Sequence, residues 1–234
     1  MLDWLMAPID SARPHAVDWF VAWHARLMVL AWAILIPAGI VIARFFKITP
    51  RQRWPERLDN PLWWHSHRGL QYAGGVLMGL ALALILRRTG TASGGWHGAL
   101  GWAVLAGAGL QYLSGWLRGS KGGPTEPAPD GSLRGDHYDM TLRRRLFEIW
   151  HKGAGYALAL MATATLLGGL WLANGPRWMW LVLALWWAGL GLLAVVLQRR
   201  GMAHDTYQAI WGPDPQHPGN RIRPIGWGIR RRAG

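Results

Sequence analysis

The segment LMVLAWAILIPAGIVIA, residues 27–43, decides the class of fold because none of its 17 residues is charged. Together with the residues from about Val17 onward it can cross a bilayer, which takes about 20 mainly apolar residues in a helix. Pro37 should kink this helix, as membrane helices tolerate. Four further stretches have the same apolar character: Gly69–Leu86, Trp96–Leu117, Gly153–Pro176 and Trp178–Gln198. The sequence therefore predicts an all-α integral membrane protein with five spans.

The composition agrees with a membrane protein and excludes several kinds of soluble site. The chain of 234 residues is 51% hydrophobic, yet its formal net charge is +13. Because it has no cysteine, disulfides, thiolate nucleophiles and iron–sulfur clusters are excluded. The basic residues flank apolar stretches instead of covering one polar face, which argues against nucleic acid as a partner and for membrane lipid. The bias toward Arg, Ala, Gly and Trp is typical of a GC-rich, bacterial genome.

The distribution of positive charge predicts the orientation and the domains. With five alternating spans, 20 of the Lys and Arg residues fall on one side of the membrane and five on the other. The richer side should be cytoplasmic, which places the N-terminus outside and the C-terminus inside a bacterial inner (plasma) membrane. We expect a short periplasmic tail over 1–16, a membrane domain over 17–198 and a basic cytoplasmic tail over 199–234. The spans are placed at about 17–44, 64–88, 96–118, 148–174 and 177–198.

Two segments outside the spans are predicted to lack regular structure. The loop from Gly119 to Met140 is rich in Gly, Pro and Asp, and the tail from Gly201 contains four prolines and should form an irregular cap. The histidines of loops and tails are expected to be solvated, with His137 as an alternative metal or partner site; they are His15, His137, His204 and His217.

Four histidines lie just inside the starts of the first four spans: His24, His67, His97 and His151. Because neighbouring spans run in opposite directions, His24 and His97 fall in the outer leaflet, and His67 and His151 in the inner one. One histidine near a helix end is more often an interfacial residue than a ligand. Four histidines at matching depth predict a functional site, since ionisable groups inside membrane spans are energetically costly.

The two pairs of imidazoles match the ligands of haem b better than those of zinc. Each leaflet offers two histidines and no carboxylate pair, whereas zinc sites take three or four protein ligands. A b-type haem requires two axial imidazoles from facing helices and an apolar slot between them, and bundle cores hold such cofactors. The sequence therefore predicts two haems b per chain in a four-helix bundle formed by the first four spans.

Glycines near the ligands admit two interpretations. Gly101 and Gly155 lie four residues after His97 and His151, on the same helix face, where a small residue would make room for a porphyrin. Such glycines also serve ordinary helix packing. Spacing alone does not choose between His67 and His65, which is two residues away and is also followed by a glycine, Gly69.

Three basic residues adjoin the histidines and could pair with haem propionates. They are Arg26, Arg68 and Lys152. Their alternative role is to reach toward lipid headgroups.

The residues that carry these features resemble the cytochrome b561 superfamily, especially the membrane part of its DOMON-linked branch. The first span reads His24-Ala-Arg-Leu27-Met28, then Trp32, Pro37, Gly39 and Ala43-Arg44-Phe45. The second reads His67-Arg-Gly-Leu70-Gln71, the third has His97 and Leu110-Gln111, and the fourth reads His151-Lys-Gly-Ala-Gly155-Tyr156. The resemblance covers about residues 17–198. It implies one haem b per leaflet and favours His67 over His65 as the ligand, because of Gln71.

The resemblance implies electron transfer across the membrane between a donor and an acceptor, such as a quinone or a partner redox protein. The long third loop and the tail differ from the eukaryotic members, so ascorbate is not assigned as the donor. The alternatives are a haem-bearing anchor subunit of a larger dehydrogenase or oxidase complex, and a transporter or structural subunit without haem. Arg143, Arg144 and Arg145 could dock an anionic donor, and the chain could form a homo-oligomer.

Overall fold

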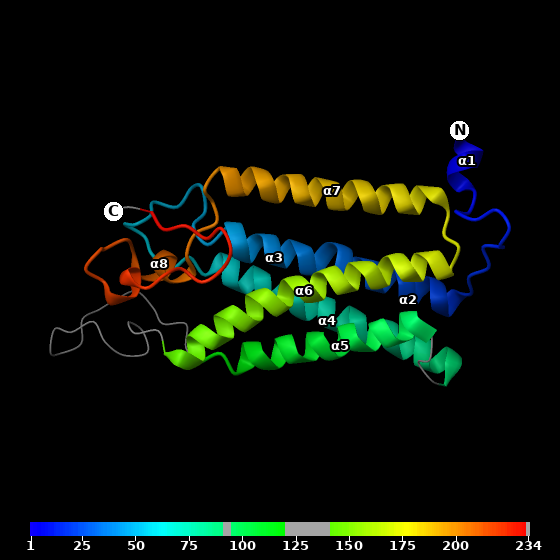
Figure 1. Cartoon of the computed structure of the whole chain (residues 1–234), viewed down its shortest axis with the longest axis horizontal. Helices are drawn as coiled ribbons and strands as arrows, with labels where there is room; N and C mark the ends of the chain where they lie inside the picture. Colours follow the sequence, from blue (N-terminus) through cyan, green and yellow to red (C-terminus); the bar gives the residue numbers. More distant parts are fainter. Residues whose placement is uncertain (91–94, 120–140, 233–234) are drawn as a thin grey trace. The chain divides into compact units, whose positions relative to one another are not determined.

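The computed structural model describes residues 1–90, 95–119 and 141–232. The described residues form helices and contain no strand (Figure 1). The long elements are α2 (Trp19–Val29), the π-helical segment η1 (Leu30–Leu35), α3 (Ile36–Phe45), α4 (Leu62–Thr89), α5 (Gly95–Trp116), α6 (Leu142–Leu172) and α7 (Arg177–Arg199). Short helices are α1 (Leu2–Met6), α8 (Thr206–Trp211) and the 3₁₀ turn η2 (Pro218–Arg221). The loop expected over Gly119–Met140, with His137, lies almost wholly outside the described residues.

Four of the long helical stretches within the described residues are long and apolar enough to cross a membrane. They are Trp19–Phe45, which joins α2, η1 and α3, and the helices α4, α6 and α7. Large apolar side chains on these helices face outward, as lipid contact requires; Leu160 is 73% exposed and Leu185 is 72% exposed. The helix α5, with 22 residues, is not among these four. Its role as a fifth span therefore stays a prediction.

The expected disturbance at Pro37 takes the form of a π-helical turn. The segment η1 ends one residue before Ile36-Pro37, and the Ile36 N–H donates to Ala31 five residues back. Pro37 has no N–H to donate to the carbonyl of Ala33, four residues earlier. The indole of Trp186 on α7 donates to that carbonyl instead, at 2.6 Å. The helix continues through the proline because a neighbouring helix replaces the missing donor.

Side chains and glycines fix the ends of these helices. Asp18 caps α2 by accepting from the Val21 N–H at 3.0 Å. Thr141 accepts from the Arg144 N–H at 3.3 Å, and α6 therefore begins six residues before the expected span, extending through the basic residues. At the end of α7, Gly201 adopts a φ of 72°, and the Met202 N–H bonds the carbonyl of Leu197 at 3.1 Å.

The chain forms two compact units, each made from discontinuous pieces. The first comprises Met1–Ala38, Gly69–Gly109 and Ala157–Ala194. Its core is apolar and built from small and medium residues, namely Ala31, Trp32, Ala33, Ile36, Met78, Ala81, Val104, Ala108, Leu158 and Ala162. The N-terminal segment is tied to the turn before α7, where buried Asn174 donates to the carbonyls of Asp10 and Arg13. Figure 1 shows α1 beside the start of α7.

The second unit comprises Gly39–Arg68, Leu110–Tyr156 and Val195–Gly234, and its core contains both apolar and polar side chains. The tail is folded into this core, since every residue of α8 is buried. His204 and His217 are each only 2% exposed, so the expectation that they are solvated is wrong. Neighbouring Asp205 is only 1% exposed and shows how a charged residue of the tail can be buried. Its carboxylate pairs with Arg231 at 2.8 Å, and its backbone N–H donates to the Arg230 carbonyl. Prolines and charges do not prevent burial when such pairing is available.

Candidate functional site

Each unit contains two histidines whose rings face one another. In the first unit His24 on α2 and His97 on α5 have ring centres 6.5 Å apart, with planes at 82°. In the second unit His67 on α4 and His151 on α6 have ring centres 6.2 Å apart, with planes at 86°. The four span-start histidines are therefore brought together in the two pairs that alternating spans suggested.

The separation of the rings suits a metal ion bound between them. A metal–nitrogen bond of about 2.0 Å and a ring radius of about 1.1 Å put two axial imidazole centres about 6.2 Å apart. Aromatic rings in direct edge-to-face contact cover the same range. Within the part of the chain that the structure describes, no group of three or more His, Cys, Asp or Glu side chains could hold a metal ion. Two imidazoles alone therefore fit a metal whose remaining ligands come from a macrocycle, as in haem.

Backbone carbonyls orient one histidine of each pair. Nδ1 of His24 lies 3.0 Å from the Ala81 oxygen, and Nδ1 of His67 lies 3.0 Å from the Gly39 oxygen. Since a carbonyl only accepts, Nδ1 carries the proton in both rings, and Nε2 is left with its lone pair. Proteins commonly fix the orientation of a metal-binding imidazole by such a hydrogen bond from its other ring nitrogen. In His151, Nδ1 is buried and has no hydrogen-bond partner.

The glycines near the histidines divide into two groups. A Cβ on Gly101 or Gly155 would meet no atom within 4 Å, so space is open beside both residues. By contrast, a Cβ on Gly74 would lie 3.0 Å from the Ile36 side chain, so Gly74 serves helix packing. Gly169, which the sequence reading did not single out, would place a Cβ 2.9 Å from Cε1 of His97. The absence of a side chain there lets the His97 ring lie against α6.

His65 and His67 differ in environment as their spacing on a helix requires. Residues two apart point to different faces. His65 is exposed, whereas His67 is half-buried and its ring faces His151. Gln71, one turn further along α4, donates to the Ile36 carbonyl at 3.2 Å, next to Pro37.

The three basic residues beside the histidines have different partners. The guanidinium of Arg26 lies over Trp23 at 5.1 Å, and that of Arg68 over Trp64 at 5.4 Å; both arginines are exposed. Lys152 pairs with the Glu148 carboxylate at 2.7 Å and donates to the Ile225 carbonyl at 2.6 Å. The positive charge of Lys152 is therefore already paired with a carboxylate of the protein itself.

The second unit also buries a polar cluster that sequence reasoning missed. Its members are Lys47, Arg144, Glu148, His204 and Tyr207. Lys47 donates to the His204 carbonyl at 3.1 Å, and Arg144 donates to the Tyr207 hydroxyl at 2.8 Å. Burial lowers the pKa of Lys47 to about 7. Because Arg144 is only 7% exposed, it is not available to a donor, unlike exposed Arg143 and Arg145.

Comparison with known proteins identifies relatives of this chain. The chain is 26% identical over 148 residues to a cytochrome b561, DM13 and DOMON domain-containing protein of Arabidopsis thaliana. It is 29% and 28% identical to ferric-chelate reductase 1 of Bos taurus and Homo sapiens, over 150 and 151 residues. Each match covers 63% of this chain, but the chain spans only 14% of the plant protein and 22% of the reductases. No family model and no solved structure matches. These similarities support a relationship between this chain and the cytochrome b561 family.

Proposed function

We propose that residues 17–198 form a cytochrome b561-type domain that transfers electrons across a membrane through two b-type haems. The observation that carries the proposal is the presence of one facing histidine pair in each compact unit. His24 and His97 would hold one haem, and His67 and His151 would hold the other. The similarity to cytochrome b561 proteins supports electron transfer across the membrane as the general activity.

The residues of the chain would bind and shield the cofactors. Ala81 and Gly39 hold the imidazoles of His24 and His67 in the metal-binding tautomer, and the open space beside Gly101 and Gly155 would accommodate flat rings. Arg26 and Arg68 would pair with propionates. When bound, a haem supplies reversible one-electron chemistry at its iron.

The proposed topology keeps α5 as a membrane span, which gives five spans in total. Two contacts support it: a Cβ on Gly107 would lie 2.8 Å from Leu158 on α6, and His97 lies against Gly169 of the same helix. The excess of Lys and Arg on one side favours an external N-terminus, residues 1–16, and a cytoplasmic tail, residues 199–234, in a bacterial plasma membrane. In this orientation His67 and His151 lie near the cytoplasmic face.

Visible spectroscopy tests the cofactor. Protein purified from cells that make haem should show reduced b-type bands, and pyridine haemochrome analysis should give two haems per chain. A colourless protein that is folded by circular dichroism would refute the proposal. One haem per chain would refute the two-site arrangement.

Single substitutions assign the two sites. His24→Ala or His97→Ala should remove one haem and leave the other, and His67→Ala or His151→Ala should remove the second. His65→Ala is the matched control, because it removes an imidazole from the same helix and should leave both haems in place. Loss of haem in His65→Ala together with retention in His67→Ala would reverse that assignment.

Vesicles test the transfer itself. Protein is reconstituted into vesicles that contain ascorbate, and an impermeant ferric chelate is added outside. Because relatives are named ferric-chelate reductases, this acceptor is the first to try. Chelate reduction should depend on the protein and fall in the single-haem variants. An intact haem spectrum without transfer to any external acceptor would favour an anchor subunit that works only inside a larger complex.

A further inference from the structure

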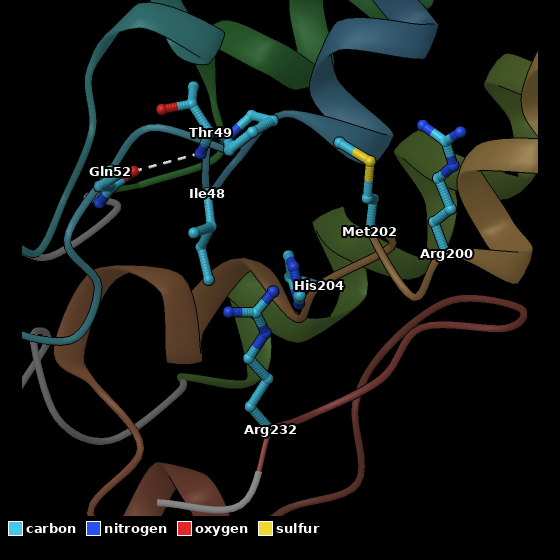
Figure 2. A pocket seen from close by; sticks show the side chains of 8 residues that line it. Ile48, Thr49, Gln52, Arg200, Met202, His204 and Arg232 are labelled. Atoms are coloured by element: carbon cyan, nitrogen blue, oxygen red, sulfur yellow. Dashed lines mark hydrogen bonds between the residues drawn. The ribbon is translucent and has the colours of Figure 1, made fainter.

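A cavity lies between the loop that follows α3 and the segment that follows α7, entirely within the second unit. Its volume is about 310 Å³, and its wall is formed by Ile48, Thr49, Pro50, Gln52, Arg200, Met202, His204 and Arg232 (Figure 2). This volume is at the lower end of the range for small-molecule sites. The proposed electron-transfer sites use none of these residues.

The charge of the lining is of one sign. Arg200 and Arg232 line the cavity, and no carboxylate among the described residues does. The nearest acid in sequence, Asp205, is committed to Arg231 at 2.8 Å. Among the described residues no carboxylate pairs with Arg200 or Arg232; the guanidinium of Arg232 lies 5.8 Å from the centre of the Trp54 ring. Two arginines on one small cavity form an environment that attracts an anion.

His204 adds a buried polar atom without a partner. Its side chain lines the cavity and is 2% exposed, and its Nδ1 has no hydrogen-bond partner. Burial, together with the positive charges of Arg232 and Lys47, lowers the pKa of His204 to about 4. The ring is therefore neutral at pH 7 and offers one N–H donor. A buried ring nitrogen left unpaired costs free energy unless a ligand or water bonds it.

We propose that this cavity binds a phosphate group beside Arg232 and His204, whose side chains lie next to one another in Figure 2, and that Arg200, on the far side of Met202, adds positive charge at the edge of the cavity. Phosphate suits the lining because its several oxygens can accept from a guanidinium group and from an imidazole N–H at the same time. The apolar side chains of Ile48, Pro50 and Met202 would contact the remainder of the ligand. The group belongs either to a lipid head or to a free phosphate compound, since the site follows the ends of two membrane helices.

Calorimetry with the full-length protein in detergent tests the site, with inorganic pyrophosphate as the probe. The double variant Arg200→Gln/Arg232→Gln should bind pyrophosphate at least about tenfold more weakly than the wild type, because each charge-assisted bond contributes appreciably to binding. Arg199→Gln/Arg230→Gln is the matched control. It removes the same charge from exposed neighbours that do not line the cavity, and binding should be unchanged.

The source of the phosphate is settled by a second measurement. Wild type and double variant are washed extensively in detergent after purification from phosphatidylglycerol-rich membranes, and retained phospholipid is measured. More lipid on the wild type supports a lipid headgroup. Equal lipid, together with pyrophosphate binding that only the double variant loses, supports a soluble phosphate compound.

The proposal is overturned if wild-type protein neither binds pyrophosphate nor retains extra lipid. It is also overturned if the control variant loses binding as strongly as the cavity variant, because the effect would then be net charge alone. The haem spectrum of every variant should stay that of the wild type, so failure here is distinguishable from failure of the proposed electron-transfer function.

Discussion

The replacement donor at Pro37 gives a sharp prediction about stability. Trp186→Phe removes the indole N–H that bonds the Ala33 carbonyl at 2.6 Å and keeps an aromatic ring on α7. Because Pro37 cannot donate to that carbonyl, the oxygen is left unpaired inside the membrane part of the protein. An unpaired buried group costs about 1–3 kcal/mol, and measured bonds between membrane helices contribute about 0.6–2 kcal/mol. We therefore expect a loss of about 1 kcal/mol from the hydrogen bond itself.

A double-mutant cycle separates this loss from that of packing. Pro37→Ala supplies an N–H to the Ala33 carbonyl through the regular helical bond. In that background Trp186→Phe should cost about 1 kcal/mol less than in the wild type, a coupling within reach of such cycles. Trp187→Phe, on the same helix, is the control and should show no coupling to Pro37→Ala.

The assay is unfolding of the purified protein in mixed detergent–SDS micelles, followed by circular dichroism. If Trp186→Phe lowers the free energy of unfolding equally in the wild type and in the Pro37→Ala variant, the indole of Trp186 does not replace the donor missing at Pro37. This holds whatever the size of either single effect.

Three further predictions concern other sites. Burial lowers the pKa of Lys47 to about 7, so between pH 7 and 9 the unfolded chain binds a proton at this residue that the folded chain does not, and the free energy of unfolding should rise with pH. Lys47→Met should flatten this rise. If the unfolding midpoint of the variant depends on pH as steeply as that of the wild type, Lys47 is not the group responsible. Gly169→Ala places a Cβ 2.9 Å from Cε1 of His97 and should weaken or remove the His24–His97 haem band, whereas Gly109→Ala, with open space around it, should keep both bands. Arg144→Gln breaks the bond to the Tyr207 hydroxyl, at a cost of about 1–3 kcal/mol, and should speed tryptic cleavage of the tail; Arg143→Gln should not, and equal rates would argue against this bond as the anchor of the tail.

The folded tail is hydrogen-bonded to the part of α6 that carries His151, a member of the second histidine pair. The helix α8 and the C-terminal segment belong to the same compact unit as His67 and His151. Lys152, one residue after His151, donates to the carbonyl of Ile225 in this segment. Loosening of the tail should therefore disturb the turn of α6 that carries His151.

The positions and character of the membrane helices could be predicted from the sequence, because a helix that crosses lipid must be apolar over a fixed length whatever it packs against. The four span-start histidines were visible for the same reason, since ionisable residues stand out in apolar stretches. The pairing of these histidines followed from the opposite directions of neighbouring spans alone. The choice between His65 and His67 did not follow from spacing, because it depends on which face of α4 meets α6.

The helical class, the positions of the four histidines near the starts of apolar stretches and the uneven distribution of positive charge could be read from the sequence, because each depends on a residue and its neighbours along the chain. The tertiary structure alone decided that Trp186 replaces the donor missing at Pro37, that Gly169 makes room for His97, and that the polar tail is buried with Lys47 and Arg144. These features arise where segments far apart in sequence exchange hydrogen bonds and share space, and local composition carries no information about such partners.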